Sequence, residues 1–179
     1  MNIVVVIPTY NEILNIGRTI DSLVGKEFPK IKGHKMSLLV VDGHSTDETA
    51  ELVLTKAKKY KNIFLLEEGS KRGLGMAYAA GFTYAINKLK AEAVMEMDSD
   101  LQHNPSDVKR FVAELDNGFD YILGSRFIPG GTIPKDWGFK RKFLSIIGNL
   151  VFRVAFLNFQ IHDFTTGFRL GRVKNFLDK

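Results

Sequence analysis

The chain opens with Ile3–Ile7 (IVVVI), a short apolar run that ends in the polar residues Pro8–Glu12 (PTYNE). A short run of Val and Ile predicts a strand buried on both faces of a parallel sheet. The same pattern recurs in Ala93–Met97 (AVMEM), which is followed directly by Asp98 and Asp100. Apolar strands that end in polar and acidic residues decide the fold and also mark where a ligand would bind.

Working outward from these two runs, strand-like and helical segments alternate along the chain. The expected strands are Ile3–Ile7, Ser37–Val41, Ile63–Leu66, Ala93–Met97 and Tyr121–Gly124, and the expected helices are 11–24, 46–60, 74–89 and 105–115. Strands that alternate with helices of about 10–15 residues predict an α/β fold around a mostly parallel sheet flanked by helices.

The composition is that of one globular domain. The chain has 179 residues, of which 45% are hydrophobic and 25% charged, so it can bury a sizeable core and is too apolar for a disordered chain. It has no cysteine, which excludes disulfide scaffolds and cysteine nucleophiles. The net charge of +5 is mild and no basic block is present, so we expect no nucleic-acid partner.

Neither of the two longest apolar stretches has the pattern of a membrane span. The run at Ile3–Ile7 lacks a preceding positive charge, and we expect a strand there and not a signal peptide. The stretch Phe143–Phe159 contains Arg153 and falls short of the roughly 20 clean apolar residues that a spanning helix needs. We therefore expect a soluble or peripheral protein.

Asp98, Asp100 and Gln102 form a candidate metal site. Ligands of open α/β sheets bind beyond the carboxyl ends of the strands, which is where these residues are expected. Two carboxylates one residue apart can converge on a divalent cation that also binds phosphate oxygens, and Gln102 adds a neutral oxygen. The alternative is a polar loop that caps the helix beginning near Pro105. An Asp-x-Asp pattern alone is weak, but its position after a buried strand favours the metal site.

Tyr10, Glu12 and Asp42 are candidates for nucleoside binding. Tyr10 offers a flat face for a base or ribose, and Glu12 can accept hydrogen bonds from hydroxyl or N–H groups. Asp42 follows the second expected strand, where a carboxylate often reads a ribose or a base edge. Capping of the following helices is the alternative for Glu12 and Asp42, and both roles can hold at once.

The segment Gly69–Gly75 has the composition of a phosphate-binding loop. It combines glycines with Lys71 and Arg72 directly before a helix N-terminus, which attracts anions. Its glycine spacing matches neither the P-loop nor the Rossmann fingerprint, and it follows the third strand. The alternative is a flexible turn with solvated charges.

The last third of the chain changes character. Trp137 and the basic residues Lys140–Lys142 precede the apolar helical segment that begins at Phe143. Positive charge and a tryptophan beside an apolar helix are typical of an element that lies in a membrane interface. The sequence pattern is equally compatible with an ordinary buried helix that is preceded by basic residues.

Four motifs together resemble the family 2 inverting glycosyltransferases. They are Pro8–Glu12, Asp98–His103 (DSDLQH), Gly124–Phe127 (GSRF) and Thr166–Arg169 (TGFR), and the resemblance covers nearly the whole chain. Within that family the chain is most similar to the polyprenyl (dolichyl) phosphate mannosyltransferases.

The resemblance implies the GT-A fold, with a nucleotide-sugar-binding core over residues 1–130. It also implies an acceptor-side segment over residues 131–179, with a basic amphipathic interface helix, in the same domain and shorter than the family's usual C-terminal part. The implied nucleotide-sugar-binding residues are Pro8, Tyr10, Glu12, Asp42, Lys71, Arg72 and Asp98. The implied ligands of Mg²⁺ or Mn²⁺ are Asp98, Asp100 and Gln102, and the implied acceptor-binding residues are Arg126, Arg141 and Ser145. The catalytic set would be Asp100, Arg126 and Arg141.

The activity implied by the resemblance is transfer of a hexose with inversion from a nucleoside diphosphate sugar to a polyprenyl phosphate. Mannose is the favoured sugar and GDP-mannose the favoured donor, and the protein would act as a peripheral protein on the cytoplasmic face of a membrane. No protein nucleophile is needed, because the acceptor phosphate is already ionised at neutral pH.

Gly43 departs from the family pattern, which usually has a second Asp at this position. This departure bears on nucleoside recognition. A family 2 enzyme with a different donor such as UDP-glucose or with a saccharide acceptor, and a catalytically incomplete nucleotide-sugar-binding paralogue, stay open as alternatives. A nucleotidyltransferase is disfavoured, because it would need a glycine-rich basic loop where Pro8–Tyr10 stands.

Overall fold

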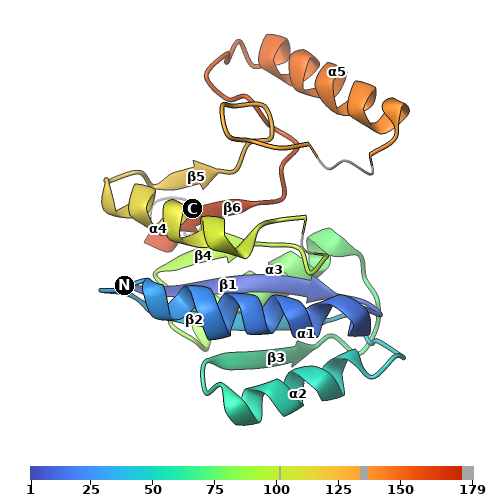
Figure 1. Ribbon diagram of the computed structural model, residues 1–179, viewed down its shortest axis with the longest axis vertical. Coiled ribbons are helices and arrows are strands. Elements are labelled where there is room, and N and C mark those ends of the chain that lie inside the picture. Colours follow the sequence, from blue (N-terminus) through green and yellow to red (C-terminus); the bar gives the residue numbers. More distant parts are fainter. Residues whose placement is uncertain (101, 134–136, 175–179) are drawn as a thin grey trace. The chain divides into compact units, whose positions relative to one another are not determined.

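The computed structural model describes residues 1–100, 102–133 and 137–174. Within these residues lies a sheet of six strands in the order β3-β2-β1-β4-β6-β5 (Figure 1). The strands are β1 (Asn2–Thr9), β2 (Lys35–Asp42), β3 (Ile63–Glu67), β4 (Ala93–Glu96), β5 (Tyr121–Leu123) and β6 (Arg169–Arg172). The helices are α1 (Ile13–Ser22), α2 (Thr49–Lys59), α3 (Leu74–Asn87), α4 (Val108–Asp116) and α5 (Phe139–Ala155). Short helical turns cover Leu23–Glu27, Phe28–Lys30 and Pro105–Asp107.

Strand β1 is the centre of the sheet and pairs in parallel with β2 and β4, while β2 pairs in parallel with β3. All five side chains of Ile3–Ile7 are 0% exposed. Burial on both faces explains why this strand is a continuous apolar run without alternation. The prediction of a mostly parallel α/β sheet is confirmed.

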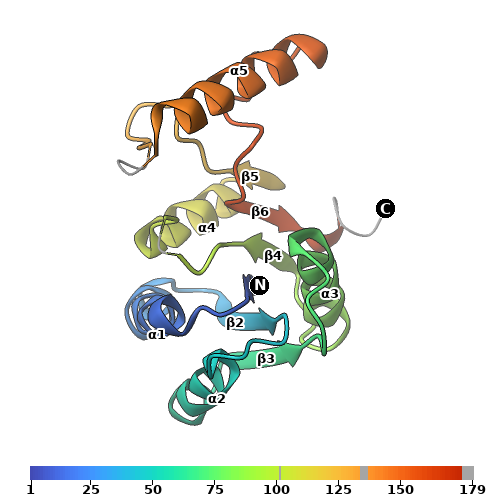
Figure 2. The ribbon, with the colours of Figure 1, turned by 90° about the vertical axis from the view of Figure 1, so that its right-hand side faces the viewer.

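Helices cover both faces of the parallel part of the sheet. Figure 2 shows α1, α2 and α4 on one side of the strands and α3 on the other. Helix α3 packs against β1 and β2, and α1 packs against α2. Strand order explains this arrangement. The chain moves outward through β1, β2 and β3 and then returns to β4, and right-handed crossovers place the returning helix on the opposite face.

Several element bounds differ from those expected. Helix α2 begins at Thr49, three residues later than expected, and α5 begins at Phe139, four residues before the expected start at Phe143. Strand β6 was not expected, because its sequence RLGR offers only one large apolar residue, the fully buried Leu170. The cap expected at Asn104 is present, since its side chain accepts a hydrogen bond from the Ser106 amide at 3.1 Å.

The described chain divides into two compact units. Unit 1 is Met1–Ile122 together with the segment from Leu170, and unit 2 is Leu123–Arg169. These units are defined by packing, and the functional division expected at residues 130 and 131 stays a prediction. Among the described helices, none has the length and apolar character needed to cross a membrane.

Gly81 is where α3 approaches the sheet most closely. A Cβ atom at this position would lie 2.5 Å from Val6 Cγ1 and 2.9 Å from Val41 Cγ2. Valine side chains in a fully buried sheet have little freedom to move aside. By contrast, a Cβ at Gly75, in the first turn of the same helix, would meet no atom within 4 Å.

We therefore expect Gly81→Ala to lower the free energy of unfolding by about 1–3 kcal/mol, because the added methyl group overpacks the helix–sheet contact. Gly75→Ala is the matched control and should leave stability unchanged or raise it by up to about 1 kcal/mol through helix propensity. Urea unfolding followed by circular dichroism measures both. Equal effects of the two substitutions would contradict the close approach.

Candidate active site

A cavity of about 360 Å³ lies in unit 1 at the carboxyl ends of the parallel strands. The carboxyl end of β1 and the loops after β1 and β4 contribute Pro8, Thr9, Tyr10, Glu12, Asp98, Ser99 and Asp100. The loops after β2 and β3 and the start of α3 contribute Gly43, Glu68, Lys71, Arg72, Gly73, Leu74 and Ala77. Most of the predicted nucleotide-binding residues thus share one cavity, while Asp42 and Gln102 are not on its described wall.

Asp98 and Asp100 form the acidic end of this cavity. The Asp98 carboxylate accepts a hydrogen bond from the Tyr78 hydroxyl at 3.2 Å, and its Oδ2 lies 3.7 Å from His103 Nε2. Burial raises the pKa of Asp98, the charges of Asp100 and Glu12 raise it further, and His103 and the Tyr78 hydroxyl oppose the rise. Negative charge is therefore concentrated at this end of the cavity.

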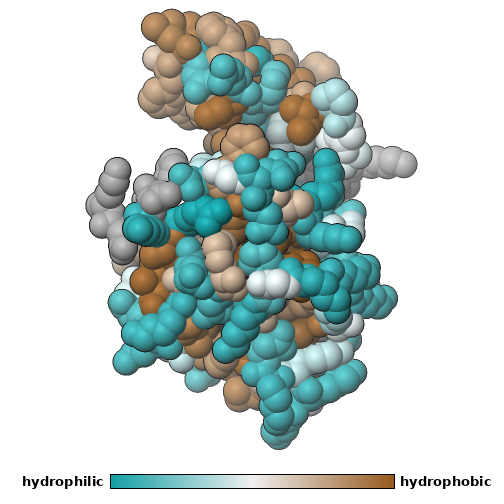
Figure 3. All heavy atoms as spheres, turned by 90° about the vertical axis from the view of Figure 1, so that its left-hand side faces the viewer, coloured by the Kyte–Doolittle hydropathy of each residue, from teal (hydrophilic) through white to brown (hydrophobic). Residues whose placement is uncertain are grey.

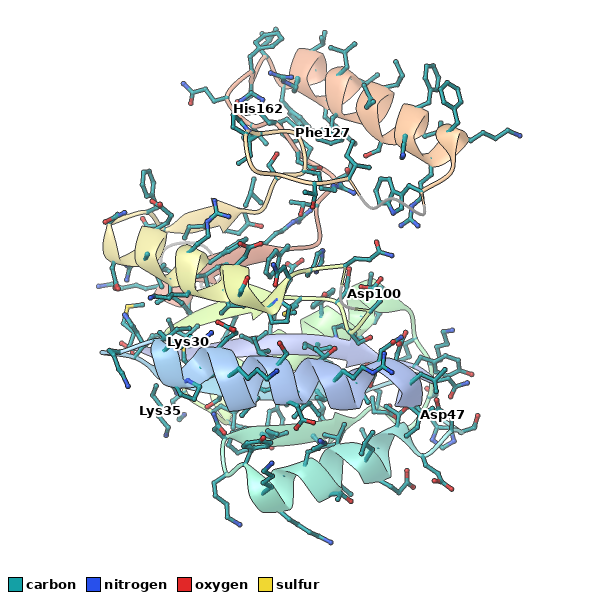
Figure 4. The ribbon with its side chains drawn as sticks, viewed as in Figure 1. Lys30, Lys35, Asp47, Asp100, Phe127 and His162 are labelled. Atoms are coloured by element: carbon teal, nitrogen blue, oxygen red, sulfur yellow. The ribbon has the colours of Figure 1, made fainter. Side chains whose placement is uncertain are left out.

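Asp100 is exposed in the loop after β4, on the side of the sheet to which β1 points (Figure 4). Its Oδ1 accepts a hydrogen bond from the backbone N–H of Gln102 at 3.0 Å, which holds the loop in a tight turn. Among the described residues, no group of three or more His, Asp or Glu side chains is placed to hold a metal ion. The two carboxylates would therefore need oxygens from a ligand to complete a coordination sphere, and the Gln102 contact stays a prediction.

Tyr10 and Lys71 lie together on the cavity wall. The Lys71 ammonium is 3.8 Å from the centre of the Tyr10 ring, within the range of a cation–π interaction. The Tyr10 side chain is 40% exposed, so its ring offers a surface to a ligand. Glu12 is the N-cap residue of α1, but its carboxylate makes no cap hydrogen bond and instead accepts one from the Asn15 side chain at 2.9 Å.

Asp42 holds the turn after β2. It is 2% exposed; Oδ1 accepts hydrogen bonds from the Thr9 and Ser45 hydroxyls at 3.0 and 2.6 Å, and Oδ2 accepts one from the Ser45 amide at 2.8 Å. These bonds close the turn after β2 but do not cap α2, whose N-cap residue is Glu48. A nucleoside contact by Asp42 stays a prediction. Gly43 follows it, and its N–H donates to the Thr9 carbonyl at 2.9 Å.

Glu68 was missed by the sequence analysis. Its side chain is 2% exposed, and Oε1 accepts a hydrogen bond from Arg72 at 2.7 Å on the wall of the cavity. Glu68 directly follows β3, but a single acid beside glycines and basic residues gives no pattern that marks it as buried. The predicted phosphate loop therefore carries a buried carboxylate as well as two cations.

In unit 2, Arg126 is locked to a buried aspartate. Its Nε and one terminal nitrogen donate to the two oxygens of Asp163 at 2.7 and 2.8 Å, and Thr165 accepts a further bond at 2.9 Å. Burial raises the pKa of Asp163, but the hydrogen bonds and charge of Arg126 outweigh it, so this pKa is lowered. Asp163 was not predicted, because one acid in a mostly apolar loop gives no pattern.

Trp137 stacks with two arginines. The guanidinium carbons of Arg126 and Arg141 lie 4.9 and 4.1 Å from the Trp137 ring centre. The tryptophan is buried, and its Nε1 has no hydrogen-bond partner in the described part of the chain. Trp137 is therefore a platform on which the two predicted acceptor-binding arginines stack, and its place beside a membrane-interface helix stays a prediction.

Helix α5 carries its polar side chains on the side that faces the rest of unit 2. Asn149 is the one buried residue of this helix, and its side chain accepts a hydrogen bond from the Phe164 amide at 2.6 Å. One turn away, Arg153 donates to the Phe159 carbonyl at 3.0 Å, and the Ser145 hydroxyl is buried without a partner among the described residues. The apolar side chains are left exposed.

Comparison with known proteins places this geometry in a family. Residues 4–178 match the family described as glycosyl transferase family 2. The chain belongs to this family. It is 36% identical over 172 residues to polyprenol monophosphomannose synthase of Mycolicibacterium smegmatis, an alignment that covers 94% of this chain and 60% of that protein. It is 33% identical over 176 residues to undecaprenyl-phosphate mannosyltransferase of Micrococcus luteus, covering 96% and 67% of the two chains.

Solved structures of the same fold agree with this assignment. The family 2 chain superposes on glucosyl-3-phosphoglycerate synthase of Mycobacterium tuberculosis with a TM-score of 0.68 at 19% identity, over 97% of this chain and 57% of that one. It matches a mannosyltransferase of Pyrobaculum calidifontis, solved with GDP-Man and Mn²⁺, with a TM-score of 0.54 at 26% identity, over 69% and 36% of the chains. The GT-A fold prediction is confirmed. The chain spans 60% of the length of the polyprenol monophosphomannose synthase of Mycolicibacterium smegmatis.

We expect Arg126→Ala to lower the free energy of unfolding by about 3–5 kcal/mol, because it leaves the Asp163 carboxylate buried without its counter-charge. Arg110→Ala is the matched control. Its pair with Asp107 is largely exposed, and its loss should cost no more than about 1 kcal/mol. Thermal and urea unfolding measure both variants.

The pH dependence of the same pair has a defined sign. The folded-state pKa of Asp163 lies below its unfolded value, so the stabilisation is present above about pH 4 and is lost as the pH falls through the folded pKa. Asp163→Asn should flatten this part of the stability curve. An unchanged curve would show that the ion pair is not the source of the acid sensitivity.

Proposed function

We propose that this protein is a metal-dependent, inverting glycosyltransferase that moves mannose from GDP-mannose to a polyprenyl (dolichyl) phosphate. The observation that carries the proposal is the single cavity that joins Asp98 and Asp100 to the Tyr10 ring and the basic residues Lys71 and Arg72. The names of relatives support it, since these are a polyprenol monophosphomannose synthase and mannosyltransferases for undecaprenyl phosphate and dolichol phosphate. The Pyrobaculum mannosyltransferase with GDP-Man and Mn²⁺ supports the donor and the metal.

A divalent cation, Mg²⁺ or Mn²⁺, fits the acidic end of the cavity. The carboxylates of Asp98 and Asp100 are hard oxygen donors. Burial is the largest cause of the raised pKa of Asp98, and the negative charges of Asp100 and Glu12 add to it, so a cation at this end would offset that charge. Asp98 and Asp100 would hold the cation, with Gln102 as the third proposed ligand. When bound, the cation supplies positive charge to the departing diphosphate.

The remaining wall of the cavity would hold the donor. Tyr10 would stack against the nucleoside, and Pro8, Glu12 and Asp42 would shape its pocket. Lys71, whose ammonium lies over the Tyr10 ring, would contact the diphosphate, where positive charge stabilises the leaving group as negative charge develops on it. Arg72, which is bonded to Glu68, would line the nucleoside end of the donor pocket.

The acceptor phosphate would bind in unit 2 to Arg141, Ser145 and Arg126. Arg141 is exposed and pairs with no carboxylate in the described residues, so its full charge is available to a phosphate. Arg126 is largely neutralised by Asp163 and would mainly orient the Trp137 platform and the phosphate. The Ser145 hydroxyl is an unused donor on the next turn after Arg141. The ionised phosphate would attack the sugar on the face opposite the diphosphate, which inverts the anomeric carbon without a protein base.

The exposed side of α5 would lie in the membrane interface, with the protein peripheral on the cytoplasmic face. Figure 3 shows hydrophobic side chains gathered over α5. The exposed apolar residues of this helix are Phe139, Phe143, Leu144, Ile146, Ile147, Leu150, Val151, Phe152 and Val154. A helix whose apolar side is exposed beside basic residues suits an anionic lipid surface, where a polyprenyl phosphate presents its charge.

The test of the transfer reaction is Asp100→Asn, which keeps the shape of the side chain but removes its charge. We expect mannosyl transfer to polyprenyl phosphate to fall by roughly 100-fold or more, the scale for loss of a group that stabilises transition-state charge. EDTA should abolish the wild-type activity. Asp107→Asn, the same change on a half-buried residue outside the cavity, should leave transfer unaltered. Wild-type turnover in Asp100→Asn at matched Mn²⁺ concentration would refute the assignment.

The membrane role is tested by co-sedimentation with anionic and neutral liposomes. Leu144 is 69% exposed on α5, and Leu144→Asp should reduce sedimentation because a charge would enter the apolar boundary. Leu54, 50% exposed on α2, gives the matched control, and Leu54→Asp should sediment like the wild type. Binding to anionic lipid should weaken as salt is raised. Absence of any sedimentation would show that the exposed side of α5 does not bind lipid.

A further inference from the structure

We propose that Glu68 selects the nucleobase of the donor and that its carboxylate favours guanine over uracil. The inference rests on the proposed nucleotide-sugar site and assigns the base specificity of that site to one side chain. Four features support it: the order of the strands, the burial of Glu68, the hydrogen bonds that already occupy Asp42, and the donor groups of the two bases.

The order of strands fixes the direction in which a nucleotide would lie. The sheet runs β3-β2-β1-β4, so the cavity wall passes from Glu68 through Gly43 and Tyr10 to Asp98 and Asp100. Neighbouring strands are about 4.8 Å apart, which separates the two ends of this wall by roughly three strand spacings. With the diphosphate at the acidic end beside β4, the nucleoside extends toward β2 and β3.

Glu68 is fixed at the far end of this wall. Its backbone N–H donates to the Asp42 carbonyl at 2.9 Å, and its side chain is 2% exposed although it borders the cavity. Oε1 accepts the hydrogen bond from Arg72, and within the described part of the chain no donor reaches Oε2. A buried carboxylate with an unused oxygen on a cavity wall can accept a hydrogen bond from a donor group of a bound ligand.

No other acid is available at this end of the cavity among the described lining residues. Both oxygens of Asp42 are occupied by Thr9 and Ser45. Gly43 has no side chain, and a Cβ there would meet only ordinary contacts, the nearest 3.5 Å away at the Thr9 carbonyl. Glu68 therefore supplies the acceptor at this end of the cavity.

The chemistry of the bases decides which one a carboxylate favours. Guanine presents two adjacent donors, N1–H and the N2 amino group. Oε2 of Glu68 would accept one of them, and Oε1, which already accepts a hydrogen bond from Arg72, has a second lone pair for the other. Uracil presents a single N–H between two carbonyl oxygens, which a carboxylate repels. Hydrogen bonds to a charged group contribute about 1.5–3 kcal/mol each, so the difference corresponds to at least a tenfold preference.

The experiment is isothermal titration of the full chain with GDP, IDP and UDP in the presence of Mn²⁺. IDP is informative because its base keeps N1–H but lacks the N2 amino group. The variants are Glu68→Gln, which keeps the size of the side chain, and Glu67→Gln, the same charge change on the exposed neighbour as the matched control. Thermal unfolding of each variant confirms that the fold is retained.

We expect the wild type to bind GDP more tightly than IDP and IDP more tightly than UDP. Glu68→Gln should weaken GDP binding by about tenfold or more and leave UDP binding within about threefold, while Glu67→Gln changes neither. An equal loss of affinity for all three nucleotides would show that Glu68 acts by holding Arg72 and not by contacting the base. That result would overturn base selection. Unchanged affinities would overturn it as well. If the wild type bound none of the three nucleotides, the result would contradict the proposed nucleotide site itself.

Discussion

The structure depends on the parallel pairing of β1 with β2 on one side and β4 on the other. Because these strands run in the same direction and are buried on both faces, their carboxyl ends come out at one edge of the sheet. The apolar side chains of Ile3–Ile7 leave no alternative register, since a slip of one residue would bring the polar loops into the core. One edge therefore collects the loops that follow β1, β2, β3 and β4, and the cavity forms there.

Unit 2 is organised around a polar centre and not around parallel strands. Asp163, a fully buried carboxylate, binds Arg126 in a bidentate pair. Asn149 on α5 contacts both Asp163 and Thr165. This polar centre turns α5 so that its polar residues face inward and its apolar residues outward. A buried pair of this kind contributes little net stability, but removal of either partner is costly, so it specifies one arrangement of the arginines.

The fold was largely predictable from the sequence, and the site only in part. Continuous apolar runs and the caps around them located the parallel strands, because burial on both faces leaves a strong local signal. Strand β6 was missed because its pairing with β4 and β5 depends on contacts distant in sequence. The lining role of Tyr10, Lys71, Asp98 and Asp100 followed from their positions after strands. Glu68 and Asp163 were missed because each acts as a single buried acid, and burial of one acid leaves no periodic pattern in the sequence.

The central claim is that the carboxyl edge of β1 and β4 binds a metal–nucleoside diphosphate through Asp98 and Asp100. The most direct measurement is anomalous scattering from crystals of this protein grown with Mn²⁺ and GDP. The account predicts one strong anomalous peak within coordination distance, about 2.0–2.3 Å, of carboxylate oxygens of both Asp98 and Asp100, with the base at the β3 end. A peak elsewhere, or GDP bound in the cavity with no anomalous peak beside these carboxylates, would contradict it.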